Sequence, residues 1–327
     1  IIGNKAHGIC LSYSSNNNTI YGNNISYNNH YGINLISSLG NSIYGNNIRN
    51  NGEDGIVLGF SFNNSIYRNN IIGNKAHGIC LSYSSNNNTI YGNNIIDNED
   101  DGIHLENVWY SSSSSNNNTI YGNNISYNNH YGIYLSYSSD NSISRNDITD
   151  NNWSGIYLSY SSDNFIQRNN IIDNNNDGII ISDSSSNNTI FRNNITNNNW
   201  SGIHLSYASN NNTISRNIVD NNFYGIYITN LSINNTISRN LIVDNKDFGV
   251  DIYSSNCTSI NENNFIDNRF HAIFYYSFLN NWSENYWDNW FFRLPKPIIG
   301  MMYLDFIGKT IPWINFDWHP AKKPYDI

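Results

Sequence analysis

A glycine followed by isoleucine recurs along the chain at intervals of 23 or 24 residues. The step occurs at Gly8, Gly32, Gly55, Gly78, Gly102, Gly132, Gly155, Gly178, Gly202 and Gly225, and it continues as Gly249-Val250 and Ala272-Ile273. The 30-residue interval from Gly102 to Gly132 departs from this period and indicates one inserted loop at about residues 107–115. A fixed period of this length is typical of solenoid proteins, in which each repeat is one structural unit.

Each repeat carries three short apolar segments, which residues 8–11, 19–20 and 23–25 illustrate in the first repeat. Alternation places Ile9 and Leu11 on one face of a strand and Cys10 on the other. The polar clusters between the segments are typical of turns. A single coil of this kind cannot bury its isoleucines, so successive coils must stack and pair in parallel. We therefore predict an all-β fold, a single-stranded right-handed parallel β-helix of about 12 coils.

Leucine-rich repeats have a similar period, but their LxxLxLxxN pattern is absent and no segment shows the apolar spacing of a helix. Asparagine is abundant at equivalent positions of successive coils, and stacked amides can bond to one another as ladders. Such a ladder is predicted at Asn24, Asn47, Asn70, Asn94 and Asn124. Much of the asparagine is thereby explained without a functional role.

The repeat pattern fades at about residue 280, which predicts two regions: repeats over 1–280 and an irregular aromatic capping segment over 281–327. The second region is rich in tryptophan and proline. A cap would cover the apolar side chains and unpaired strands of the last coil. The sequence begins inside a repeat, so we expect further coils or another domain upstream of Ile1.

Composition argues against several partners. Charged residues make up 13% of the chain and the net charge is −9, which disfavours nucleic acid and anionic lipid surfaces because both require clustered cations. No apolar run approaches the length of about 18 residues that suggests a membrane-spanning helix. The three cysteines are far apart and imply neither a disulfide framework nor a zinc motif. The sequence does not indicate an oligomeric state.

The coil pattern of Gly-Ile-x-Leu, Asn-x-Thr/Ser-Ile and Asn-Asn-Ile resembles the NosD-type parallel β-helix family, which includes repeat-containing surface proteins of archaea. Residues 284–288 read Glu-Asn-Tyr-Trp-Asp and residues 324–327 read Pro-Tyr-Asp-Ile, and both resemble endings found in that family. The resemblance implies an extracellular or cell-surface location, with the periplasm as the alternative, and it brings a copper-handling accessory role as one functional candidate. The fold is shared with polysaccharide lyases and hydrolases, but fold alone transfers no chemistry.

Aromatic residues gather at one position of the coil, immediately after the Gly-Ile step. The group comprises Tyr134, Tyr157, His204 and Tyr227, with Trp153 and Trp200 two residues before their glycines. Sugar rings stack on flat aromatic faces, so this strip is a candidate glycan platform. The alternative is that the rings stack on one another and only stiffen the sheet.

Five arginines occupy another column, at positions that are mostly glycine in earlier coils: Arg145, Arg168, Arg192, Arg216 and Arg239. Guanidinium groups bind carboxylates or sulfates in bidentate fashion, so this column could bind an acidic polysaccharide. Alternatively, neighbouring aspartates and turn carbonyls neutralise it.

Two patterns suggest metal ions. Asp150, Asp173, Asp220, Asp244 and Asp267 precede asparagine in equivalent turns, and the last three are the candidate calcium ligands. Aspartate also bonds its own backbone in turns without any ion. Copper rests on the family resemblance only, because His7, His30, His77 and His130 lie near their glycines but not at one position, and methionine occurs only at Met301 and Met302.

Acidic, basic and aromatic residues converge beside the inserted loop. The group comprises Asp100, Asp101, His104, Glu106, Trp109 and Tyr110. A glycoside hydrolase needs two carboxyl groups flanking its substrate, and neighbouring coils could supply them. The basic residues and aspartate motifs of β-helix lyases and polygalacturonases are not recognisable, however, so Asp100, Asp101, His104 and Glu106 are weak catalytic candidates.

These patterns favour a non-catalytic extracellular or cell-surface scaffold that binds or organises carbohydrate. The alternatives are a polysaccharide lyase or hydrolase, a NosD-like periplasmic copper-handling protein, and a purely structural envelope protein. Asn-x-Ser/Thr sequons are frequent, at Asn17 and Asn63 for example, so an exported chain would be a glycoprotein.

Overall fold

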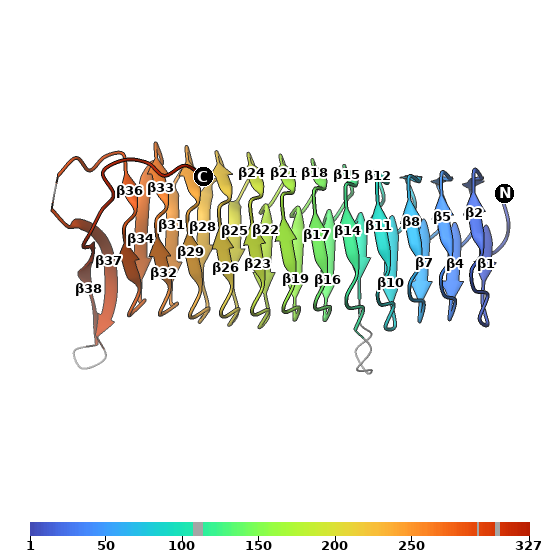
Figure 1. Cartoon of the computed structure of the whole chain (residues 1–327), viewed down its shortest axis with the longest axis horizontal. Helices are drawn as coiled ribbons and strands as arrows, with labels where there is room; N and C mark the ends of the chain where they lie inside the picture. Colours follow the sequence, from blue (N-terminus) through green and yellow to red (C-terminus); the bar gives the residue numbers. More distant parts are fainter. Residues whose placement is uncertain (107–113, 293, 305–307) are drawn as a thin grey trace. The chain divides into compact units, whose positions relative to one another are not determined.

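The computed structural model describes residues 1–106, 114–292, 294–304 and 308–327. Its regular elements are all strands, and they confirm the predicted right-handed parallel β-helix of about 12 coils (Figure 1). Most of the inserted loop, with Trp109 and Tyr110, lies outside the described residues. The chain forms two compact units, residues 1–170 and residues 171–327. We call them unit 1 and unit 2.

Unit 1 contains three series of strands, one strand of each series per coil. The first series is β1 (Ile9–Leu11), β4 (Ile33–Ile36), β7 (Ile56–Gly59), β10 (Ile79–Ser82), β13 (Ile103–Leu105), β16 (Ile133–Ser136) and β19 (Ile156–Ser159). The second is β2 (Thr19–Tyr21), β5 (Ser42–Tyr44), β8 (Ser65–Tyr67), β11 (Thr89–Tyr91), β14 (Thr119–Tyr121), β17 (Ser142–Ser144) and β20 (Phe165–Gln167). The third is β3 (Asn24–Ser26), β6 (Asn47–Arg49), β9 (Asn70–Ile72), β12 (Asn94–Ile96), β15 (Asn124–Ser126) and β18 (Asp147–Thr149), and β21 (Asn170–Ile172) begins at the boundary between the units.

Unit 2 repeats the same three series. The first is β22 (Ile179–Ser182), β25 (Ser201–Leu205), β28 (Tyr224–Ile228), β31 (Phe248–Tyr253) and β34 (Phe270–Tyr275), and the second is β23 (Thr189–Phe191), β26 (Thr213–Ser215), β29 (Thr236–Ser238), β32 (Ser259–Asn261) and β35 (Asn281–Ser283). The third is β24 (Asn194–Thr196), β27 (Ile218–Asp220), β30 (Leu241–Val243), β33 (Asn264–Ile266) and β36 (Tyr286–Trp287). Two longer strands follow, β37 (Lys296–Leu304) and β38 (Lys309–Asp317).

The repeat sets the register within each series. β10 pairs in parallel with β13, so that Ile79 faces Ile103 and Leu81 faces Leu105. These isoleucines and leucines are fully buried, as the alternating pattern predicts. Apolar columns of this kind therefore form the core of each unit.

The recurring glycines are required by close packing of adjacent coils. A Cβ atom on Gly32 would lie 2.5 Å from Ile48 Cγ2 and 2.6 Å from the carbonyl oxygen of Gly55. Real Cβ atoms do not approach a backbone oxygen this closely. The glycine column thus marks a corner at which successive coils leave no room for a side chain.

Asparagines form the predicted ladder and also three buried ladders that the sequence interpretation did not identify. In the predicted ladder, Asn94 Nδ2 donates to Asn70 Oδ1 at 2.7 Å. The buried ladders of unit 1 pass through Asn41, Asn46 and Asn51 and their equivalents in neighbouring coils. In them, both the backbone N–H and the side-chain amide of one asparagine donate to the Oδ1 of the next, as Asn46 does to Asn69 at 3.1 and 3.0 Å.

The aromatic segment at the end of unit 2 is more regular than predicted. β37 and β38 form an antiparallel hairpin, and β37 pairs in parallel with β34. Trp282 and Trp287 are buried, and the fully buried Asp317 accepts hydrogen bonds from the indole of Trp287 and the backbone of Asn285. These contacts fit the predicted capping role, although the segment is not irregular throughout.

Candidate functional site

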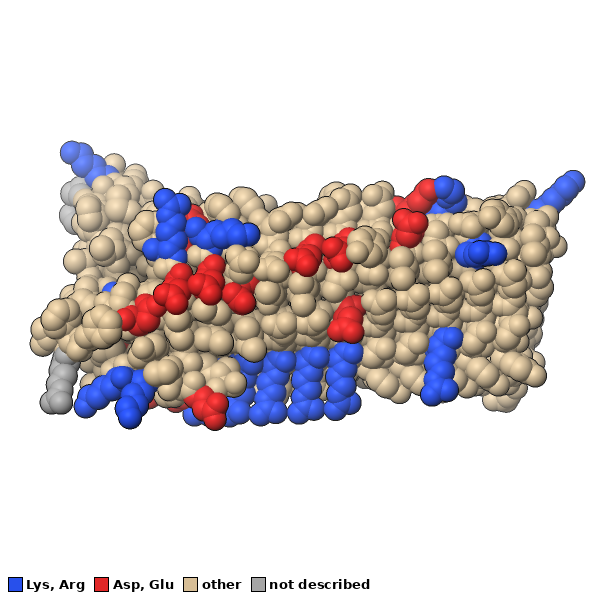
Figure 2. All heavy atoms as spheres, turned by 90° about the horizontal axis from the view of Figure 1, so that it is seen from above, with Lys and Arg blue, Asp and Glu red and all other residues tan. Residues whose placement is uncertain are grey.

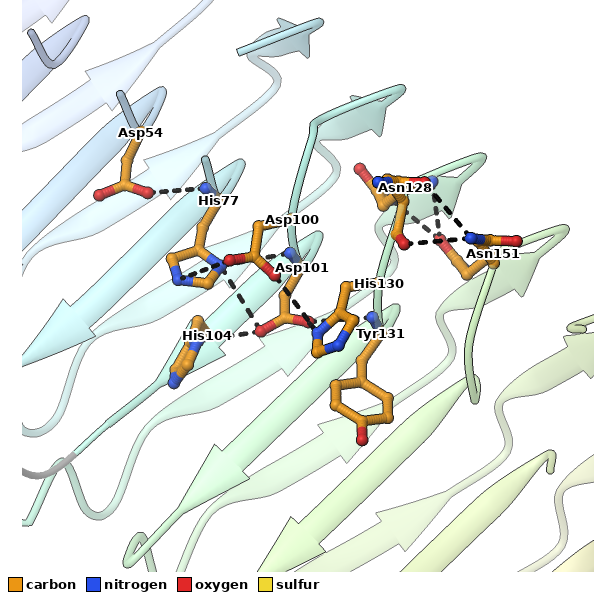
Figure 3. Close-up of polar contacts among 11 residues, drawn as sticks. Asp54, His77, Asp100, Asp101, His104, Asn128, His130, Tyr131 and Asn151 are labelled. Atoms are coloured by element: carbon orange, nitrogen blue, oxygen red, sulfur yellow. Dashed lines mark hydrogen bonds and ion pairs between the residues drawn. The ribbon is translucent and has the colours of Figure 1, made fainter. Parts of the chain in front are cut away.

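Polar and ionisable side chains converge in unit 1 on one side of the first strand series. Asp54, His77 and Asp101 each precede the glycine of their coil, so stacking brings them into one column. Asp100 and His130 come from the position before that, and His104 lies on β13, three residues after Asp101. Figure 3 shows the rings of His77, His104 and His130 around the Asp101 carboxylate. We call these six residues the His–Asp cluster.

Asp101 is the centre of the cluster and is 1% exposed. Its Oδ1 accepts hydrogen bonds from His130 Nδ1 and from the backbone N–H of Tyr131, both at 2.9 Å. Its Oδ2 lies 2.9 Å from His104 Nδ1 and 3.5 Å from His77 Nδ1. The contact with His104 does not have the alignment of a hydrogen bond, and His104 Nδ1 is shielded from solvent.

The surroundings shift the pKa values of these groups in different directions. Burial raises the pKa of Asp54 to about 7, although its carboxylate accepts the backbone N–H of His77 at 2.7 Å. Burial, aided by the charge of His104, lowers the pKa of His77 to about 3. Burial alone would also raise the pKa of Asp101, but the contacts with His104 and His130 outweigh it and hold the pKa well below its usual range. Clusters of perturbed groups of this kind are frequent at functional sites.

A pocket of about 310 Å³ adjoins the cluster, and Asp54, Cys80 and Glu106 contribute to its lining. Cys80 lies at the outward position of β10, yet it is only 5% exposed, and burial raises the pKa of its thiol. The sequence groups Glu106 with Asp100, Asp101 and His104. In the structure, Glu106 lines this pocket together with Asp54. Two carboxyl groups from coils far apart in sequence therefore line one cavity.

The sequence comparisons identify the family of the chain. A family model described as "right handed beta helix region" matches residues 1–112 and 108–237. The chain belongs to this β-helix family. No curated protein matches the sequence. In the described residues, no helix is long and apolar enough to cross a membrane.

Solved structures show the same fold at low identity. The A-module of the mannuronan C-5 epimerase AlgE6 from Azotobacter vinelandii is 14% identical, with a TM-score of 0.64 over 75% of this chain and 77% of that module. A point mutant of the periplasmic alginate epimerase AlgG is 15% identical, with a TM-score of 0.50 over 76% of this chain and 74% of that protein. The Dettilon tailspike protein is 17% identical, with a TM-score of 0.57 over 78% of this chain and 61% of the tailspike.

The rings of the predicted aromatic strip are arranged in two ways: some stack face to face, and others meet at a tilt. Tyr134 and Tyr157 stack face to face with centroids 5.0 Å apart, so each covers one face of the other. Trp153 instead is 44% exposed and tilts against His130 at a centroid distance of 4.1 Å. In unit 2, Trp200 stacks on Phe223 and His204 stacks on Tyr227. Trp200 is 43% exposed, almost the same as Trp153, but Phe223 stacks on one face of Trp200, whereas the ring contacts of Trp153 are tilted or edge-on.

In both units the arginines of this column lie in turns between the second and third strand series. Arg145 and Arg168 in unit 1, and Arg192, Arg216 and Arg239 in unit 2, all have positive φ near 55°. Arg239 forms an ion pair with Glu262. Within the ranges that the structure covers, the other four have no carboxylate partner within ion-pair distance. Most of the face in Figure 2 is neither acidic nor basic, as expected from the composition.

The aspartate column requires one correction. Asp220 ends β27 and aligns with Thr196 and Val243, so Asn221 rather than Asp220 occupies the turn position equivalent to Asp244. Asp220-Asn221 and Asp244-Asn245 are both Asp-Asn pairs in sequence, but the first pair is shifted by one position along its coil. Their aspartates therefore occupy different places. Among the described residues, the groups of three close ligand atoms lie at His77, Asp101 and His104 and at Asp100, Asp101 and His130. Calcium at Asp220, Asp244 and Asp267, and copper, stay predictions.

Sequence analysis located Asp100, Asp101 and His104, but it did not join them to His77, His130, Asp54 and Trp153. These residues are 24 to 52 positions away from Asp101 and come from other coils, so only stacking brings them together. Aligning each coil on its glycine would have placed His77, Asp101 and Tyr131 in one column. Aligning each coil on its Thr/Ser-Ile step would also have revealed the stacked tyrosines at Tyr21, Tyr44, Tyr67, Tyr91 and Tyr121.

Asp177 in unit 2 shows what the same coil position does without surrounding histidines. Its side chain is 3% exposed, its nearest ionisable neighbour is His204 at 4.0 Å, and burial raises its pKa to about 7. The contrast with Asp101 comes from the number of histidines, since one distant ring does not compensate a buried carboxylate.

We expect Asp177→Asn to remove a pH-dependent loss of stability. Because the pKa is raised on folding, the contribution of Asp177 is fully present below about pH 4 and is lost as the pH rises to about 7. An amide can still accept the N–H of Ser201, so the variant should be more stable than the parent at pH 8, by on the order of 2 to 4 kcal/mol, and equal to it near pH 4. Thermal unfolding at several pH values measures this, and parallel curves for the two proteins would contradict it.

Proposed function

We propose that the chain is an extracellular or cell-surface β-helix scaffold that binds a polysaccharide through unit 1, at Trp153, His130 and Asp100. The observation that carries the proposal is the exposed Trp153 ring beside two polar side chains. His130 Nδ1 lies 3.3 Å from Asp100 Oδ1, and the indole of Trp153 tilts against the imidazole at a centroid distance of 4.1 Å. A sugar can place its apolar C–H face on the indole and direct its hydroxyls to the imidazole and the carboxylate.

The structural neighbours agree with carbohydrate as the ligand class. Two of them are named as a mannuronan epimerase and an alginate epimerase, and their titles thus refer to polysaccharides. One neighbour is described as periplasmic, and another is described as a tailspike protein, which accords with a location outside the cytoplasm. The proposal itself rests on Trp153 and its neighbours, because identities of 14 to 17% transfer the fold only.

We expect Trp153→Ala to weaken polysaccharide binding about tenfold, because loss of one ring-stacking contact costs about 1.4 kcal/mol. Binding would be measured by affinity electrophoresis or calorimetry against a panel of neutral and acidic polysaccharides. Tyr160→Ala is the matched control, since Tyr160 is 48% exposed but lies outside the His–Asp cluster. Equal affinity of the two variants, or no binding by the parent to any polymer, would contradict the proposal.

A second candidate function is cleavage of a glycosidic bond in the pocket that Asp54 and Glu106 line. Paired carboxyl groups at one cavity are what this chemistry requires, and a volume of about 310 Å³ is sufficient for one sugar unit. Release of new reducing ends during incubation with a bound polysaccharide, abolished in Glu106→Gln, would favour it. Binding without release leaves the non-catalytic scaffold as the function.

A further inference from the structure

The three histidines around Asp101 exceed what a structural carboxylate needs. Asp101 already accepts two well-formed hydrogen bonds at Oδ1, from His130 and from the backbone of Tyr131. Its other oxygen, Oδ2, faces two more imidazole nitrogens, and neither approach is an ordinary hydrogen bond from a ring N–H. Asp101 Oδ2, His77 Nδ1 and His104 Nδ1 therefore form a group of three potential metal-ligand atoms.

His104 Nδ1 is the most informative of these atoms. It is buried, it has no hydrogen-bond partner, and it lies 2.9 Å from Asp101 Oδ2. Such a short separation arises either from a proton on His104 Nδ1, as in an ion pair with Asp101, or from a metal ion that both atoms bind. Two ligands bound to one ion at 2.0 to 2.2 Å lie about 3 Å apart when they subtend 90° and about 3.4 Å apart at the tetrahedral angle.

His77 supplies the third ligand atom. Its Nδ1 lies 3.5 Å from Asp101 Oδ2, close to the tetrahedral spacing, and the two rings of His77 and His104 have centroids 4.3 Å apart. The backbone N–H of Asp101 approaches the same Nδ1 at 3.2 Å, which shows that this nitrogen presents its lone pair toward Asp101. An ion bound there would replace that long hydrogen bond.

We propose that His77, Asp101 and His104 form a binding site for a first-row divalent metal ion of the Zn²⁺ type. Two imidazoles and one carboxylate are borderline ligands that suit Zn²⁺ better than a hard cation such as Ca²⁺. Both imidazoles retain some solvent exposure, 16% for His77 and 12% for His104, so an ion could enter and keep a water ligand in a fourth position. Asp100 lies 3.8 Å from His77 Nε2 and orients that ring from outside (Figure 3).

Calorimetric titration of the full chain, freed of metal by chelation and dialysis, tests the site with Zn²⁺ alone. We expect one Zn²⁺ to bind per chain at this site, and His77→Ala and His104→Ala each to weaken that binding at least tenfold. His204→Ala is the matched control, because His204 is a partly buried histidine beside the buried Asp177, and no second histidine lies close to that carboxylate in the described residues. Zinc binding that persists unchanged in His104→Ala, or that is lost in His130→Ala but not in His77→Ala, would overturn the assignment.

A second measurement keeps the proposal testable if a histidine variant unfolds. Zn²⁺ should raise the melting temperature of the parent chain, and Co²⁺ in its place should give the intense visible absorption of a low-coordinate nitrogen and oxygen site. No thermal shift together with a spectrum like that of aqueous Co²⁺ would refute the site. Neither experiment uses carbohydrate, and Trp153→Ala should bind Zn²⁺ as the parent does, so failure of this site and failure of polysaccharide binding are distinguishable.

Discussion

Gly32→Ala is expected to lower the free energy of unfolding by about 4 kcal/mol, far more than is usual for adding one methyl group. The new Cβ would lie 2.6 Å from the carbonyl oxygen of Gly55 and 2.5 Å from Ile48 Cγ2. The backbone oxygen cannot move aside, because Gly55 O accepts the N–H of Ile33 at 2.9 Å in the pairing of adjacent coils. Relief of the clash must therefore separate two coils. Thermal unfolding followed by circular dichroism measures the effect.

Gly92 provides the matched control for this prediction. It lies in a turn with φ of +62°, and the nearest atom to an added Cβ is Arg68 Cγ at 3.7 Å. Arg68 itself adopts positive φ at the equivalent position of the previous coil. Gly92→Asn should therefore cost about 1 kcal/mol or less, since asparagine tolerates this conformation. Equal losses for the two variants would show that flexibility of glycine, rather than lack of space, explains the repeat.

The fold could be predicted from sequence because its main determinants are local and periodic. The Gly-Ile-x-Leu segment fixes which side chains are buried, and a period of 23 or 24 residues fixes which ones stack. The predicted amide ladder at Asn70 and Asn94 also follows from the period. The hairpin of β37 and β38 could not be predicted in the same way, because it occurs once and no repeat marks its register.

The site was only partly predictable, since its residues belong to different columns. Asp100, Asp101 and His104 drew attention because they cluster in sequence beside the inserted loop. His77 and His130 were considered only as copper ligands and were not joined to Asp101, because the approach of side chains from neighbouring coil positions depends on the path of the corner between strands. The period shows that two residues are one coil apart, but it does not show that His130 Nδ1 points at Asp101.

The buried asparagine ladders lead to the second prediction of large effect. The two members of the Asn69-Asn70 pair look alike in sequence, yet Asn69 is buried, whereas Asn70 is the first residue of β9 and only partly buried. Asn69 accepts both the backbone N–H and the side-chain amide of Asn46, and its own amide donates to Asn93 Oδ1 and to the carbonyl oxygen of Ile43. We expect Asn69→Ala to lower the free energy of unfolding by about 4 kcal/mol, because several buried groups lose their partners at once.

Asn70→Ala separates the ladder geometry from the mere loss of an amide. Asn70 is the adjacent residue and also belongs to a ladder, with bonds of 3.3 Å to Asn47 and 2.7 Å from Asn94, but it is only partly buried and water can replace those partners. Its replacement should cost less than about 1 kcal/mol. Comparable unfolding midpoints for the two variants would mean that the buried ladder contributes little. A large difference would identify the buried asparagine, Asn69, as the residue that holds successive coils at their fixed spacing.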